Sequence, residues 1–192
     1  MSALSSFPKQ FHTGFCVSVG IAVLVLSGCA SVAPPYQATN DNVRAIQVLP
    51  GSKVAVGEFK AQKESLNHLT IRGGSFDSPY SASFAEYLKT ALVLELQSAG
   101  KLDSSSKVII TGELISNNLD AAIGTGTASI SARIVVMRAD EKTFDKVVSV
   151  ENQWESSFVG AIAIPLARQN YGDTVKKLIS KLVTDSDFQK AL

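Results

Sequence analysis

Few residues of this chain could do chemistry, and its two cysteines come first because a thiol is intrinsically very nucleophilic. Cys16 lies inside an apolar run at 15–26 that we expect to be discarded as part of an export segment. Cys29 follows the same run after the small residues Ser27 and Gly28. A thiol in that position is suited to forming a thioether with diacylglycerol. We therefore expect the chemistry at Cys29 to be its own lipidation.

Residues 1–28 have the layout of an export signal. The apolar run FCVSVGIAVLVL at 15–26 is preceded by a polar stretch whose only full charge is Lys9. This run is too short to cross about 30 Å of hydrocarbon as a stable helix, which favours an export signal over a membrane span. We expect residues 1–28 to be removed.

The end of this signal resembles the bacterial lipobox, in the motif Leu26-Ser27-Gly28-Cys29. The resemblance implies recognition of Leu26, Ser27 and Gly28 by a signal peptidase, and a diacylglycerol and an N-acyl chain, such as palmitate, on Cys29. Several acyl chains hold a protein on a membrane stably. Ala30 and Ser31 follow the cysteine where an aspartate would favour the inner membrane, so we expect a lipid anchor in the outer membrane with the domain in the periplasm. The alternative is an ordinary signal peptide with a chance cysteine.

The composition of the mature chain argues against nucleic acid as a partner. Removal of Lys9 leaves 17 of the 18 lysines and arginines against 17 aspartates and glutamates, and no dense cationic run is present. With Cys29 lipidated, no thiol is left for a disulfide. The length fits one globular domain, which we assign to 43–192. We expect 29–42 to be a lipidated flexible tether, because SVAPPYQATNDN at 31–42 is polar, holds a Pro-Pro pair and lacks an apolar period.

The rest of the chain predicts an α+β fold. Short β-branched segments flanked by turn residues indicate strands, and clean alternation at 127–138 places Ala128, Ile130, Ala132, Ile134 and Val136 on one covered face. The Gly-rich 124–127 is interpreted as a hairpin turn or bulge. We expect four to six strands in a mostly antiparallel or mixed sheet, packed by a helix at about 79–99 and a C-terminal helix at about 165–184. The expected strands are 52–59, 69–72, 107–117, 127–138 and 144–158.

Groups for catalysis or metal binding are scarce in the mature chain. Its single histidine, His68, lies in a polar loop, and His/Cys zinc sites and calcium loops are excluded by the residues present. Glu151 and Glu155 could act as a carboxylate pair of an envelope hydrolase, or could simply be the exposed face of a strand that buries Trp154. We therefore expect no enzyme, no metal and no cofactor other than the covalent lipid.

The segment FVGAIAIPLA at 158–167 is more apolar than a loop requires. One interpretation is a loop packed over the core. The other is an exposed patch, formed by Phe158, Val159, Ile162 and Ile164, that binds an envelope protein or a lipid. A related hypothesis is a ligand-binding auxiliary of a lipid or polysaccharide transport system, which would need an apolar cleft between the helix at 79–99 and the sheet.

The order of these features resembles the YajG-like small proteobacterial outer-membrane lipoproteins, and NQWESSFVGAIAIP at 152–165 carries the closest likeness. The wider group resembles penicillin-binding-protein activator and curli-secretion lipoproteins. The resemblance implies a non-enzymatic role as an envelope accessory or partner-binding protein. Some relatives of this group are labelled acyltransferases. Those enzymes resemble one another in their hexapeptide repeats and a catalytic histidine, and neither feature occurs here.

Overall fold

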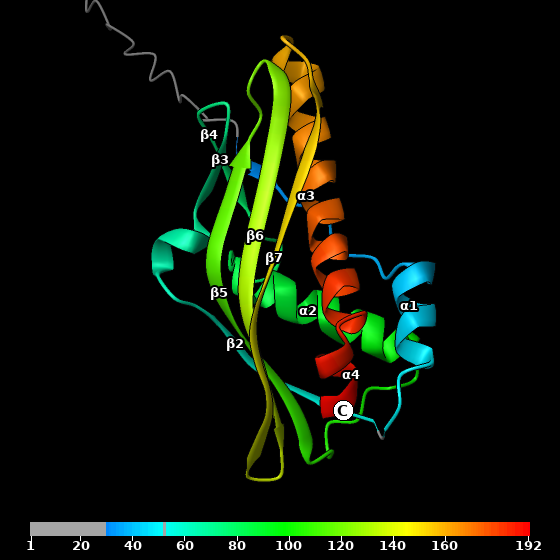
Figure 1. Cartoon of the computed structure of the whole chain (residues 1–192). Coiled ribbons are helices and arrows are strands. Elements are labelled where there is room, and N and C mark those ends of the chain that lie inside the picture. Colours follow the sequence, from blue (N-terminus) through cyan, green and yellow to red (C-terminus); the bar gives the residue numbers. More distant parts are fainter. Residues whose placement is uncertain (1–29, 52) are drawn as a thin grey trace, which may run out of the picture.

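The computed structural model describes residues 30–51 and 53–192 and shows a tall four-stranded sheet with helices on one face (Figure 1). The strand order is β2-β5-β6-β7. The strands are β2 (Ala55–Ala61), β5 (Val108–Asp120), β6 (Gly124–Arg138) and β7 (Glu141–Ser156). The predicted α+β class, with a mixed sheet in a single domain, is confirmed.

The last three strands of the sheet form an antiparallel meander, whereas β2 runs parallel to β5. Alternation along β6 is as predicted, since every second side chain faces the helices and is buried. These side chains are Ala128, Ile130, Ala132, Ile134 and Val136. The turn or bulge predicted at 124–127 is wrong, because these residues begin β6 and pair with the end of β7. Gly124, the first of them, has a φ of +88°, a conformation that glycine adopts without steric cost.

Helix α2 (Phe84–Ser98) begins later than the predicted residue 79. Residues 79–83 form a turn instead, in which Ser81 and Ala82 both have a φ of 52°. The helix is capped by Ser83, whose Oγ accepts a hydrogen bond from the Glu86 amide at 3.2 Å. Pro79, where the helix was predicted to begin, therefore lies in a turn and not in the helix.

Helix α3 (Gly160–Val183) begins before the predicted residue 165 and runs from the upper end downwards over the same face of the sheet as α2 (Figure 1). Pro165 is inside it and lacks the N–H that would donate to the carbonyl of Ala161. Ala161 is exposed, so water can satisfy that carbonyl and the proline is tolerated. Segment 158–167 is thus not a loop, because most of it forms the first turns of α3.

The predicted flexible tether at 31–42 is wrong, because these residues belong to the folded domain. Strand β1 (Ser31–Val32) pairs with β4 (Gly74–Asp77), which pairs with β3 (Leu69–Ile71) in a second, three-stranded sheet. Helix α1 (Asn40–Gln47) then starts inside the segment.

Long-range contacts hold this N-terminal segment in place. The Tyr36 hydroxyl donates to Oε1 of Glu95 at 2.7 Å, and the Tyr87 hydroxyl donates to the Pro34 carbonyl at 2.9 Å. Both partners lie in α2, more than fifty residues along the chain. Because these partners are distant in the sequence, the composition of 31–42 does not indicate them. That composition alone therefore predicted a tether.

Two short helices complete the described part of the chain, the 3₁₀ helix η1 (Glu64–Asn67) and α4 (Ser186–Ala191). Asp185 caps α4, its carboxylate accepting from the amides of Asp187 and Phe188. Among residues 30–51 and 53–192, no helix has the length and apolar character needed to cross a bilayer.

Candidate functional site

The predicted apolar patch lies at the junction of β7 and α3. Phe158, Val159 and Ile162 are 76%, 47% and 58% exposed. Ile164 differs from the prediction, because it is partly buried against the core. It lies on the inward side of the first turns of α3, whereas Phe158 precedes the helix and Ile162 is on its outward side. The strand predicted at 144–158 included Phe158, but β7 ends at Ser156, so Phe158 lies beyond the strand.

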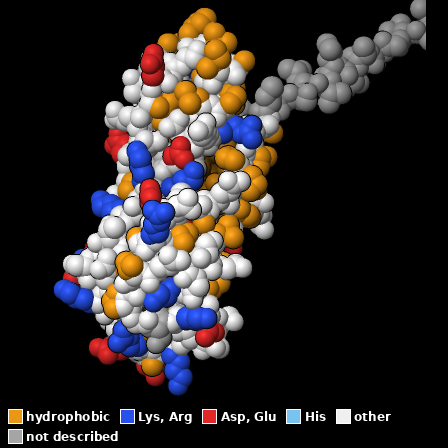
Figure 2. All heavy atoms as spheres, turned by 90° about the vertical axis from the view of Figure 1, so that its right-hand side faces the viewer, with side chains coloured by type: hydrophobic (Ala, Val, Ile, Leu, Met, Phe, Trp, Pro, Cys, Tyr) orange, Lys and Arg blue, Asp and Glu red, His pale blue; other side chains and the backbone are white. Residues whose placement is uncertain are grey.

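A further apolar side chain joins this surface from the turn between β5 and β6. Ile123 is 65% exposed, and the adjacent Gly124 pairs with Ser156 at the end of β7. Ile123, Phe158, Val159 and Ile162 therefore lie at one end of the molecule, and we call them the apolar tip. Figure 2 shows hydrophobic side chains gathered at this upper end. An apolar residue beside a turn glycine was the signal that could have revealed Ile123.

Arg72 ties the two loops of the apolar tip together. Its Nε donates to the carbonyl of Ala121, and its Nη2 donates to the carbonyl of Ser157 at 2.9 Å. Arg72 itself sits in the β3–β4 turn with a φ of 51°, which aims its side chain across the end of the sheet. Because its guanidinium is used by backbone carbonyls, Arg72 braces the tip and does not act as a free cation. The sequence had assigned this residue only to a strand.

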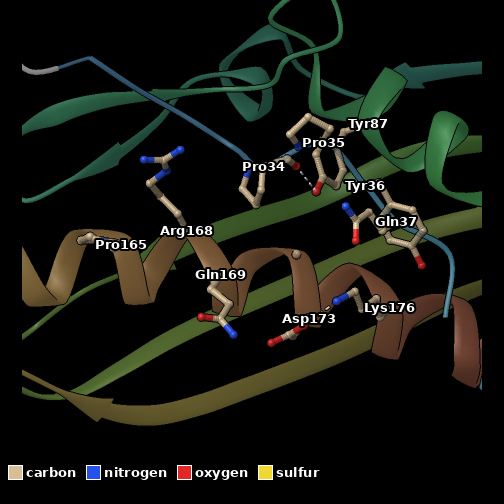
Figure 3. A pocket seen from close by; sticks show the side chains of 11 residues that line it. Pro34, Pro35, Tyr36, Gln37, Tyr87, Pro165, Arg168, Gln169, Asp173 and Lys176 are labelled. Carbon is tan, nitrogen blue, oxygen red and sulfur yellow. Dashed lines mark hydrogen bonds and ion pairs between the residues drawn. The ribbon is translucent and has the colours of Figure 1, made fainter.

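A groove of about 430 Å³ separates the N-terminal segment from α3 (Figure 3). One wall is Pro34, Pro35, Tyr36 and Gln37, and the other comes from the α3 residues between Pro165 and Lys176. Burial raises the pKa of Tyr87 above its ordinary range, so this phenol at the base of the wall stays protonated and donates to Pro34.

The charged side chains along the groove differ in their partners. Lys176 is paired with Asp173 at 2.9 Å. Arg168 projects from α3 towards Pro34 in Figure 3, and its Nε is buried without a hydrogen-bond partner among the described residues. A guanidinium placed in this way is suited to a carboxylate or phosphate. Sequence reasoning missed the groove because its two walls meet only in the fold.

The carboxylate pair considered for hydrolysis has unsuitable geometry. Glu151 and Glu155 are exposed on β7, on the side away from Trp154, and Oε1 of Glu151 accepts from Gln153 at 2.7 Å. Four residues along a strand span about 13 Å. Glycosidases hold their two carboxyl groups about 5 to 9.5 Å apart. His68 is exposed near Glu64, at 3.8 Å, and contacts no nucleophile.

The cleft required for an internal ligand is absent from the described residues. Between α2, α3 and the sheet there is only a void of about 20 Å³, lined by apolar side chains such as Leu88, Ile134 and Leu178. That volume holds no more than about one water molecule. The hypothesis of a lipid cleft between the helix predicted at 79–99 and the sheet is therefore wrong.

The lipidation motif lies outside the residues that the structure describes, as does the whole expected export signal. Leu26, Ser27, Gly28 and Cys29 consequently keep the roles that the sequence predicts for them. The first described residue, Ala30, immediately precedes β1.

Comparison with known proteins finds likeness in fold. Neither protein-family models nor curated proteins match the sequence. Among solved structures, protein XCC0632 from Xanthomonas campestris, of family DUF330, matches with a TM-score of 0.59 and 11% identity, covering 80% of this chain and 91% of that one. A candidate lipoprotein from Caulobacter crescentus matches with a TM-score of 0.42 and 10% identity, over 78% and 93% of the two chains.

Lipoprotein GNA1162 from Neisseria meningitidis is more distant, with a TM-score of 0.31 and 8% identity over 63% of this chain and 96% of that one. Of these three structures, XCC0632 has the highest TM-score, and its 11% identity shows a likeness of fold alone. The chain thus shares its fold with XCC0632.

Proposed function

We propose that this chain is a bacterial envelope lipoprotein, anchored through Cys29, that works by binding and not by catalysis. The lipobox-like motif supports the anchor, and the resemblance to YajG-like outer-membrane lipoproteins supports a role as an envelope accessory. Ala30 and Ser31 after the cysteine support residence in the outer membrane.

The observation that carries the binding role is the apolar tip. Full burial of a side chain such as Phe158 or Ile162 is favourable by about 1.5 to 3 kcal/mol each, and the folded domain leaves both in water. Exposed apolar side chains grouped from two separate loops are typical of a contact surface. Scattered single apolar residues, by contrast, need no such explanation.

The anchor is tested by changing Cys29 to Ala in the full chain. We expect the protein with its original sequence to incorporate radioactive palmitate and to sediment with outer membranes. The Cys29→Ala variant should do neither. Replacement of Cys16 by Ala is the matched control, because it removes the other thiol and should leave labelling intact. Palmitate incorporation that survives Cys29→Ala would end the proposal.

The non-enzymatic role is tested by complementation. Replacing Glu151 and Glu155 together by Gln should leave a deletion phenotype fully complemented, whereas Cys29→Ala should not complement. If the double glutamine variant does not complement the deletion although it reaches the membrane in normal amount, the result would support the hydrolase hypothesis. The acyltransferase alternative has no matching residue that could be tested in this way.

The groove beside Arg168 favours a second candidate function, that of a ligand-binding auxiliary for an anionic group. Here the unpartnered guanidinium Nε carries the argument. Inorganic phosphate is the probe, and we expect it to raise the melting temperature of the protein but not that of an Arg168→Gln variant. Arg168→Lys keeps the charge and serves as control. Equal shifts in the original protein and the glutamine variant would exclude the groove as the site.

A further inference from the structure

The domain begins almost directly after the expected lipidation site, so very little chain separates it from the membrane. Only Ala30 stands between the expected lipidation site and β1. Consecutive Cα atoms are 3.8 Å apart, so the Cα atoms of Cys29 and Ser31 lie within about 8 Å of each other. A lipid on Cys29 therefore holds the fold directly at the bilayer surface.

The register of β1 shows which end of the fold is held there. Ser31 pairs with Phe76 and Val32 with Asp77 in the parallel direction, and Oγ of Ser31 donates to the Ser75 carbonyl at 3.2 Å. The chain consequently enters β1 from the side on which β4 begins, which is the side of the β3–β4 turn. In Figure 1 β3 and β4 lie towards the same upper end as the start of α3.

The β3–β4 turn is also the element that braces the apolar tip. It holds Arg72, which donates to the carbonyls of Ala121 and Ser157. Val32, the residue of β1 that pairs with Asp77, is itself apolar and 45% exposed. The attachment point and the apolar tip thus share one end of the molecule.

We propose that the apolar tip inserts into the interface of the same bilayer that carries the lipid on Cys29. The inference rests on the proposed lipidation and specifies the partner of the tip as lipid. Bilayer contact suits its chemistry, because residues 121–126 and 157–166 contain no charged side chain. The contact is therefore apolar and does not require anionic lipids.

This orientation makes the domain stand upright. From Gly124 at the tip, β6 runs to Arg138, a strand of 15 residues that spans about 50 Å. The opposite end, at the β6–β7 hairpin, is charged: Asp145 binds Arg133 at 2.6 Å and Lys142 at 2.7 Å. A polar hairpin of this kind belongs in water, away from the membrane.

The test uses tryptophan quenching in the lipidated full chain. Trp154 is the only tryptophan of the sequence, so Trp154→Phe provides a silent background. Phe158→Trp is added to that background as the probe. Val48→Trp is the matched control, because Val48 is an apolar residue that is 82% exposed on α1, away from the tip. Both proteins are reconstituted into vesicles of neutral phosphatidylcholine brominated near the headgroup end of its acyl chains.

We expect the emission of the Phe158→Trp protein to be quenched by the brominated lipid, with no change in high salt, and that of the Val48→Trp protein to be unaffected. Flotation of the vesicles reports the anchor separately: protein that does not float contradicts the lipidation, whichever way the probe responds. Protein that floats with an unquenched probe at 158 overturns the insertion. A blue shift of the probe's emission in native membranes, with none in pure lipid vesicles, also overturns it and assigns the tip to a protein partner.

Discussion

The strongest prediction about stability concerns Glu95, a carboxyl group of α2 with no exposed surface. Its Oε1 accepts from the Tyr36 hydroxyl at 2.7 Å, from the Thr39 amide at 3.0 Å and from Nδ2 of Asn42 at 3.1 Å. No lysine or arginine pairs with it among the described residues. The residue joins α2 to the N-terminal segment and to α1. Its hydrogen bonds hold the segment that was predicted to be a flexible tether against the domain.

Replacing Glu95 with Ala should lower the free energy of unfolding by about 3 to 5 kcal/mol, because several buried donors would lose their acceptor and the shortened side chain would leave a cavity. The Thr39 hydroxyl also donates to Oε1, at 3.4 Å, so four donors would lose their acceptor. An unsatisfied buried donor costs about 1 to 3 kcal/mol. We place the total below the simple sum because the contributions of neighbouring groups in one hydrogen-bond network do not add. Oε2 accepts no hydrogen bond, so its loss adds little.

The assay is urea unfolding, combined with hydrogen exchange of the amides between Tyr36 and Asn42. Glu95→Gln is the control, since its amide oxygen can keep accepting the hydrogen bonds that Oε1 accepts. We expect it to cost less than Glu95→Ala and to leave exchange in the segment slow. A loss below about 1 kcal/mol for Glu95→Ala, within the range of an ordinary surface change, would refute this reasoning.

Three further predictions concern other parts of the fold. Gly126→Ala should lower the free energy of unfolding in urea by about 1 to 3 kcal/mol, because the added Cβ would lie 2.3 Å from the Trp154 ring. Burial, followed by the hydrogen bond to Glu95, raises the pKa of Tyr36. Unfolded tyrosine ionises near pH 10 while the folded residue stays neutral, so urea resistance should be constant below about pH 10 and fall above it. Ala30→Asp should move the protein from the outer to the inner membrane fraction, and an unchanged sucrose-gradient profile would contradict the sorting expectation.

The sheet could be predicted from the sequence because its determinants are local. Alternation in β6 and the apolar stripe of α3 follow from residues that are close in the chain, and both elements formed as expected. Element ends were less predictable, because they depend on distant partners. Helix α2 begins at Phe84, whose amide donates to Oδ1 of Asn67 at 2.9 Å, a contact that no local pattern announces.

The candidate site divides in the same way. Phe158, Val159 and Ile162 attracted attention by their apolar character alone, and the structure places them at the surface. Ile123 and Arg72 could not be added from the sequence, because they approach the patch only when the turns after β5 and β3 meet at one end of the sheet.

What the sequence determines by itself is the expected chemistry at Cys29, since a peptidase and an acyl donor read a short linear motif before the domain has folded. The tertiary structure alone decided that residues 31–42 belong to the domain. Their composition resembles a tether, and the partners that satisfy their polar groups are distant in the chain, such as the side chain of Glu95 and the hydroxyls of Tyr80 and Tyr87. Because residues 31–42 are folded into the domain, the expected lipid on Cys29 lies close to the fold. The position of β1 then determines which end of the molecule is near the membrane.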